Sequence, residues 1–166
     1  MRRRELPDEG LLGEFGEGLG IQFAFAAAAF RVRHAAVLDT VGLSPSRLVA
    51  LIYLDRNGGQ DQSSMSRALG INRASAMALV NRFEKEGLLR RGKRPGRKRP
   101  GLYLTDHGVS QLARALRLDD RFNQAMFGWL KGDERSSFIA TTLEIKRRAL
   151  VPLARLKTGE EISEET

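Results

Sequence analysis

Cysteine is absent from the 166 residues of this chain. Disulfide bonds, cysteine-ligated zinc, iron–sulfur clusters and thiol redox sensing are therefore excluded. Histidine is also scarce, since only His34 and His107 occur, and neither has a second histidine or a carboxylate at a clear ligand spacing. Each is expected to be a surface or interface residue. The sequence predicts no metal site and no cofactor.

Arrangements that support catalysis are missing as well. The sequence shows no nucleophile placed with a base, no glycine-rich phosphate loop leading into a helix, and no paired carboxylates suited to acid–base chemistry. These absences argue against an enzyme, and they direct attention to binding.

Long hydrophobic runs are lacking too. The run at 19–30 has twelve residues, whereas a helix that crosses a bilayer needs about 20. Three arginines at 2–4 precede it, as in a secretory signal, but acidic residues and four glycines separate the two segments. The sequence predicts a cytoplasmic protein with no membrane partner.

Positive charge is what the chain has in excess. The net charge is +8 and the pI is near 10.6, which favours a polyanionic partner, most simply nucleic acid. The densest segment, 93–101, contains the word Lys-Arg-Pro-Gly twice, with five cations and no acid. Each Pro-Gly pair fits the centre of a type II turn. On composition alone the segment is equally well a DNA-binding finger or a solvated linker.

Hydrophobic periodicity and capping residues predict a mainly helical chain. Helices are expected at about 19–40, 45–54, 62–69, 73–86, 106–128 and 133–150, and short strands at 88–90 and 102–104. Ser44, Asp61, Asn72 and Thr105 are expected to cap four of the helices. The helices at 62–69 and 73–86 form a helix-turn-helix, and the strands then make the basic segment the tip of a hairpin. The predicted fold class is therefore a winged helix-turn-helix between long helices.

The predicted regions are an N-terminal arm at 1–18, helical dimerisation elements at 19–43 and 106–152, the winged helix-turn-helix at 44–105, and an acidic tail at 153–166. The outer helices carry more apolar surface than one small winged helix needs, so an intertwined homodimer is expected to bury it. Their expected inward faces comprise Phe23, Ala26, Ala27, Phe30, Val37, Leu38 and Val41, then Val109, Leu112, Leu116, Phe122 and Met126, then Phe138, Thr142, Ile145 and Ala149.

Over about residues 19–152 the sequence resembles the MarR family, the multiple antibiotic resistance regulators. The likeness lies in residues 70–75 at the turn into the recognition helix, in residues 79–91 that follow it, and in residues 104–108, which match the LTxxG pattern that closes the wing. The resemblance implies a homodimeric regulator, a repressor, bound to a pseudo-palindromic promoter site in double-stranded DNA. It further implies release by a small aromatic or anionic effector.

Helical spacing divides the recognition helix into two faces. Leu79, Val80 and Phe83 should lie in the core, which leaves the N-terminal end and the opposite face for base edges. Arg73 is the best candidate for a bidentate contact to guanine, and Ser75 either contacts DNA or only supports the helix start. The arginines of the wing are expected in a narrow minor groove and its lysines on phosphates. The predicted DNA-binding set is Asn72, Arg73, Ser75, Met77, Asn81, Lys93, Arg94, Arg97, Lys98 and Arg99.

Two departures from the family pattern affect this prediction. The wing of the family usually carries an aspartate that orients an arginine, whereas no acid lies between Arg90 and Gly101. Ion-pair support of the wing is therefore expected to be absent, and the wing to be disordered without DNA. Ala78 also stands where the family often has a basic residue, so the wing should carry more of the affinity. The acidic residues Glu84 and Glu86 are expected on a solvated face.

By resemblance only, an effector crevice would be lined by Arg31, His34, Arg47 and Tyr53. Arg47 and Tyr53 serve equally well as packing residues or as phosphate contacts. Two other functions stay open at this point. One is a sequence-independent architectural DNA-binding protein. The other is a module whose basic loop meets an acidic protein or a membrane surface.

Overall fold

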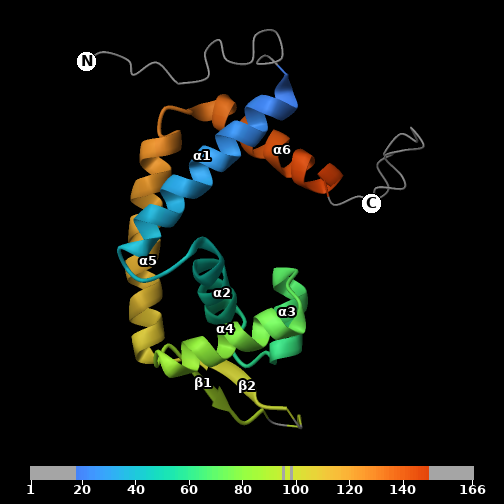
Figure 1. Ribbon diagram of the computed structural model, residues 1–166, viewed down its shortest axis with the longest axis vertical. Coiled ribbons are helices and arrows are strands. Elements are labelled where there is room, and N and C mark those ends of the chain that lie inside the picture. The colour runs from blue at the N-terminus through green and yellow to red at the C-terminus, as the bar shows by residue number, and fades with distance from the viewer. Residues whose placement is uncertain (1–17, 95, 98, 150–166) are drawn as a thin grey trace, which may run out of the picture. The chain divides into compact units, whose positions relative to one another are not determined.

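The structure is a computed structural model that describes residues 18–94, 96–97 and 99–149 (Figure 1). The predicted acidic tail, all but the last residue of the predicted arm, and Lys98 of the wing lie outside these residues. The elements along the chain are α1 (Leu19–Asp39), α2 (Pro45–Arg56), α3 (Gln62–Leu69), α4 (Arg73–Lys85), β1 (Leu89–Gly92), β2 (Gly101–Leu104), α5 (Asp106–Phe127) and α6 (Gly132–Ala149). The predicted fold class, mainly helical with a small two-stranded wing, is confirmed.

Local capping explains why the helix starts could be predicted. The side chains of Asp61, Asn72 and Thr105 accept hydrogen bonds from the backbone N–H three residues further on, at 2.8, 2.8 and 3.0 Å. Ser44 does the same for α2, and Pro45 follows it as the first helical residue. Each bond satisfies a donor that the first turn of a helix leaves without an intrahelical partner.

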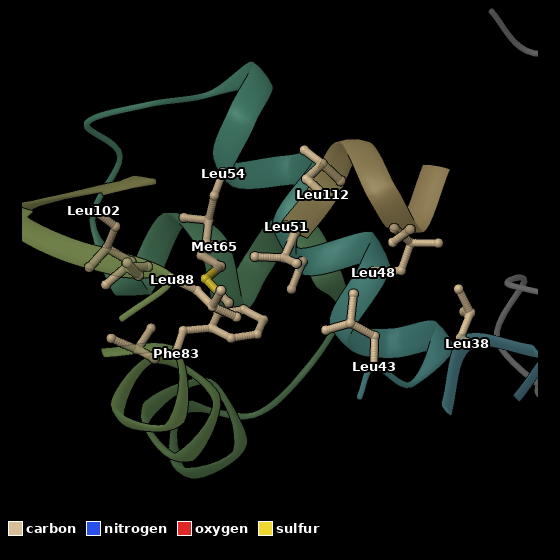
Figure 2. Close-up of a cluster of buried hydrophobic side chains, with 14 of the residues drawn as sticks. Leu38, Leu43, Leu48, Leu51, Leu54, Met65, Phe83, Leu88, Leu102 and Leu112 are labelled. Carbon is tan, nitrogen blue, oxygen red and sulfur yellow. The ribbon is translucent and has the colours of Figure 1, made fainter. Parts of the chain in front are cut away.

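The chain divides into two compact units, residues 1–122 and 123–166. The core of the first unit gathers apolar side chains from α2, α3, α4 and the hairpin, several of which are labelled in Figure 2. Phe83 is the largest side chain with no exposed surface, and Leu51, Met65 and Leu102 are also fully buried. This core fixes α4 and the hairpin on the same body, which positions the site described below.

The outer helices differ from their predicted one-sided faces. Only Leu38 is buried within α1, and no residue of α6 is buried among the described residues. In α5 the inward positions include Leu112 and Phe122, but Val109 and Leu116 are 49% and 40% exposed. The physical reason is that α1 is apolar on several sides and one chain supplies too little surface to cover it.

Among the described residues, α1 is also the one helix whose length and composition would allow it to cross a membrane. The prediction considered only the twelve-residue run, whereas the helix continues past Phe30 to 21 residues. Length and composition alone do not separate a membrane span from a helix that packs on a partner, and the comparisons below bear on that choice.

Strand β2 of the wing is hydrogen-bonded along both of its edges. β1 and β2 pair antiparallel, with Leu89 opposite Leu104 and Gly92 opposite Gly101. Leu102 then bonds to the loop that precedes α3, since its C=O accepts from Gly59 N–H at 2.8 Å and its N–H donates to Gln60 C=O at 2.9 Å. The hairpin is therefore tied to the helix-turn-helix through backbone bonds that do not depend on side chains.

The two Lys-Arg-Pro-Gly words adopt different structures. In the first, Gly96 has φ +68° and Arg97 N–H donates to Arg94 C=O at 3.1 Å, which closes the predicted turn. In the second, the prediction of a turn is wrong, because Gly101 lies in β2. A Cβ at Gly101 would come within 2.6 Å of the Gly59 carbonyl oxygen, so glycine is required there by close backbone approach.

The predicted closing motif of the wing fixes the hairpin to α5. Thr105 Oγ1 donates to Gly87 C=O at 2.6 Å and accepts from Gly108 N–H. Gly108 sits so close to the hairpin that a Cβ would lie 2.1 Å from the Leu88 carbonyl oxygen. A larger residue at 108 would push α5 away from the base of the wing.

Candidate nucleic-acid interface

The two faces of α4 lie as the sequence predicts. Val80 and Phe83 are buried and Leu79 is half-buried against the core. The predicted reading positions are all exposed: Arg73, Ala74, Ser75, Met77, Ala78 and Asn81. Asn72 lies at the helix start, where its side-chain oxygen is engaged by Ser75 N–H. A helix with an anchored inner face and a solvent-facing N-terminal end can enter the major groove of DNA.

The C-terminal end of α4 is anchored by an arginine from α2. Arg47 is only 6% exposed, and its guanidinium lies over the Phe83 ring at 5.3 Å. Its Nη1 donates to Gly42 C=O at 2.5 Å and its Nη2 to the Glu86 carboxylate. Glu86 also accepts from Arg82 Nε at 2.9 Å. This network ties the end of the recognition helix to the loop between α1 and α2.

Both acids near the end of α4 therefore have structural partners. Both side chains stay partly exposed, as expected of a solvated face, but each also has a partner that the sequence did not indicate: Glu84 accepts from Arg91 Nε of β1 at 3.0 Å and Glu86 pairs with Arg47. Glu86 and Arg47 are 39 positions apart in the chain. No local pattern connects residues so distant, and only the packing of α2 on α4 brings them together.

The wing does have ion-pair support, which corrects the prediction that it is absent. Arg94 Nη1 lies 3.3 Å from Asp61 Oδ2, and both side chains are largely covered. Arg99 Nη1 donates to Ser63 Oγ at 3.1 Å. The acid comes from the start of α3, where the sequence showed Asp61 only as a capping residue. Arg90 in turn lies over the Tyr103 ring, 5.0 Å from its centroid.

Asp61 is held in its ionised form. The Ser64 backbone N–H that donates to it lowers its pKa, and the Ser64 side chain, Arg94 and Arg99 lower it further, while partial desolvation acts in the opposite direction. The carboxylate therefore caps α3 and pairs with the wing at the same time.

Two hollows that share Arg94, Arg97 and Arg99 lie along the wing. One, of about 390 Å³, is lined among the described residues by Asp61, Ser64, Arg67, Arg94, Arg97 and Arg99. The other, of about 420 Å³, is lined by Arg91, Gly92, Lys93, Arg94, Arg97, Arg99 and Pro100. Arginines that converge on an open hollow attract anions, phosphate above all. Arg67 belongs to this surface although the sequence reading missed it; its signal was a cation on the first helix of the helix-turn-helix.

The four residues predicted to line an effector crevice contact different parts of the protein. His34 donates from Nε2 to Asp119 Oδ1 at 2.7 Å and stacks on the Phe122 ring, with centroids 5.1 Å apart. Phe30 packs against both rings. Arg31 is exposed, Tyr53 is half-buried at the edge of the core, and Arg47 is engaged as described above. His107 is exposed in the first turn of α5, as expected.

Comparison with known proteins agrees with this geometry. The profile of the MarR family matches residues 41–100, which contain the helix-turn-helix and most of the wing. A proposed transcriptional regulatory protein for the hcr operon of Thauera aromatica is 31% identical over 122 residues, covering 73% of this chain and 74% of the relative. The structure of the transcriptional repressor CouR bound to a 23-mer DNA duplex has a TM-score of 0.72 and 30% identity, covering 81% of this chain and 96% of that one.

The chain belongs to the MarR family. It is a DNA-binding transcriptional regulator, as predicted, and a sequence-independent architectural role is not favoured. A second CouR structure, bound to p-coumaroyl-CoA, covers 82% of this chain and 96% of that one with a TM-score of 0.69 and 30% identity. For this MarR-family regulator, α1 is accordingly understood as a helix of a soluble DNA-binding protein and not as a membrane span.

Proposed function

We propose that this regulator is a homodimeric repressor that occupies a pseudo-palindromic promoter site. The observation that carries the proposal is the exposed face of α4 beside an arginine-lined wing on the same rigid core. The recognition helix would enter the major groove and the wing the adjacent minor groove, with half-sites about one helical turn apart. Regulation then follows from promoter occupancy and not from catalysis, and we place the protein in the cytoplasm.

Sequence preference tests this function directly. A site selected from a random duplex pool by the full-length protein should be preferred over a random duplex of the same length by roughly 10³-fold or more. An electrophoretic mobility shift assay at fixed salt measures the ratio. Equal retention of both duplexes would indicate the architectural alternative, and no retention at physiological salt would indicate an acidic protein or membrane partner.

Arg73 is the residue whose loss should relax base discrimination most. Arg73 is exposed at the start of α4, where a bidentate contact to guanine would contribute about 1–3 kcal/mol of discrimination. Arg73→Ala should therefore weaken binding to the selected site and flatten preference at one base pair of each half-site. Binding to every single-base variant of the site measures this. Arg117→Ala, on the exposed side of α5, serves as the charge-matched control.

Dimerisation would cover the apolar surface of the outer helices. Phe23, Phe25 and Val32 of α1, and Phe138 and Leu143 of α6, are about half exposed or more in one chain, which is more apolar surface than a monomer usually presents. We assign the apolar faces of residues 19–43 and 106–152 to this interface. Helical spacing places Arg114, Arg117 and Arg121 on the opposite face of α5. Light scattering at micromolar concentration should give the mass of two chains, and a monomer there would contradict the assignment.

An effector would act by changing the spacing of the two recognition helices. Because CouR, which is 30% identical, has been observed with p-coumaroyl-CoA, an aromatic acid or its coenzyme A thioester is the class of ligand to test. The aromatic cluster of Phe30, His34 and Phe122 offers surfaces on which an aromatic ring could stack. Release of the selected duplex by such a compound, titrated in the mobility shift assay, would support this part of the proposal.

A further inference from the structure

The hollow between α3 and the wing contains one carboxylate among four guanidinium groups. Among its described lining residues, Asp61 is the only acid, and Arg67, Arg94, Arg97 and Arg99 are the cations. The residues come from both sides, since Asp61, Ser64 and Arg67 belong to the start and body of α3 and the others to the wing. The hollow is therefore assembled only when the wing is folded against α3.

The guanidinium groups that line the hollow can donate hydrogen bonds to an anion. Arg94 already holds an anionic oxygen, that of Asp61, at 3.3 Å. Arg67 Nη2 donates to Ser64 Oγ at 3.3 Å, and Arg97 is exposed at the rim. Three positive charges remain after Asp61 is paired with one of the four. Guanidinium groups bind phosphate oxygens through planar, charge-assisted hydrogen bonds.

The position of the hollow identifies which phosphate it would meet. In a helix-turn-helix, the first helix crosses the DNA backbone while the second enters the major groove. α3 is that first helix, and the wing lies next to it through the Arg94–Asp61 and Arg99–Ser63 contacts. A strand of DNA that passes from the recognition helix to the wing would run over the hollow.

We propose that this hollow binds one backbone phosphate of DNA in each protomer through Arg67 and the arginines of the wing, and that Asp61 is a positioning residue which sets selectivity. The inference rests on the proposed DNA-binding function. Asp61 holds Arg94 in one orientation before DNA binds. This orientation raises the affinity for DNA whose minor groove fits the wing. Its negative charge also opposes every incoming phosphate, which lowers affinity for DNA that lacks that fit.

Asp61→Asn separates these roles, because asparagine caps a helix about as well as aspartate but carries no charge. We expect the affinity of the full-length variant for a random duplex to rise about threefold to tenfold at ~0.1 M salt, since non-specific binding is mainly electrostatic. Preference for the selected duplex over the random one should fall by about tenfold, because Arg94 loses its orienting partner. An unchanged ratio, or an equal loss of affinity for both duplexes, would overturn the role given to Asp61.

Arg67→Ala tests the phosphate contact itself. Affinity should fall by the same factor for both duplexes, and the slope of log K against log salt should become shallower by about 2 for a dimer that loses two contacts. Arg117→Ala, which removes an exposed cation from α5, should leave the slope unchanged. If Arg67→Ala behaves like Arg117→Ala while the wild type still prefers its selected duplex, the phosphate site is wrong and the proposed function stands. If the wild type shows no preference, the proposed function itself fails.

Discussion

Replacement of Arg94, Arg97 and Arg99 together by alanine is expected to weaken binding to the selected duplex by at least about 100-fold at ~0.15 M salt. All three arginines line both hollows at the wing. If a dimer neutralises roughly eight phosphates, the slope of log K against log salt is near −7, and loss of the six wing arginines should make it markedly shallower. Fluorescence anisotropy with a labelled duplex across a salt series measures both quantities.

The control for this variant has the same charge change at a different place. Arg114, Arg117 and Arg121 are three exposed arginines along α5, so their joint replacement by alanine also removes three positive charges from each chain. Binding should fall much less, with little change of slope, because short-range phosphate contacts and not net charge dominate the effect at this ionic strength. Undiminished binding by the wing variant would contradict the role of the wing.

Phe83→Ala is expected to lower the free energy of unfolding by about 3–5 kcal/mol. Phe83 has no exposed surface, packs among side chains of α2, α3 and the hairpin, and supports the guanidinium of Arg47 (Figure 2). Its removal leaves a cavity and also removes the aromatic face on which Arg47 rests. Urea unfolding followed by circular dichroism, at one fixed protein concentration because a dimer is expected, measures the change.

Met77→Ala is the matched control on the same helix. Met77 is 52% exposed on the opposite face, so its replacement should change the unfolding free energy by less than about 0.5 kcal/mol while it alters the surface offered to DNA. A loss of less than about 1 kcal/mol for Phe83→Ala, or similar losses for the two variants, would show that α4 is not anchored through its buried face.

The helices and the family could be predicted because their signals are local. Asp61, Asn72 and Thr105 each cap a helix through a hydrogen bond to the residue three positions further on. The 3.6-residue period of a helix places Val80 and Phe83 on the buried face of α4 and Met77 on the exposed one. Helix caps and helix faces depend on residues only a few positions apart, so a short stretch of sequence is enough to predict them. The exposed face of α4 could be predicted from the same helical period.

The support of the interface could not be predicted, because it joins distant parts of the chain. Arg94 and Asp61 are 33 positions apart, and Arg47 and Glu86 are 39 apart. The wing has no acid between Arg90 and Gly101, and the acid that pairs with it, Asp61, stands at the start of α3. The second Pro-Gly pair was also predicted to form a turn, but its glycine, Gly101, lies in β2, where the backbone of Gly59 leaves no room for a side chain.

The sequence by itself determined the order of the helices, the two faces of α4 and the basic character of the wing, since capping, periodicity and composition act over a few residues. Only the tertiary structure decided which cations are held and by which partners: Arg47 on Glu86, Arg94 on Asp61, Arg99 on Ser63. The reason is that an ion pair depends on distance in space, and packing of α2, α3, α4 and the hairpin around Phe83 sets that distance.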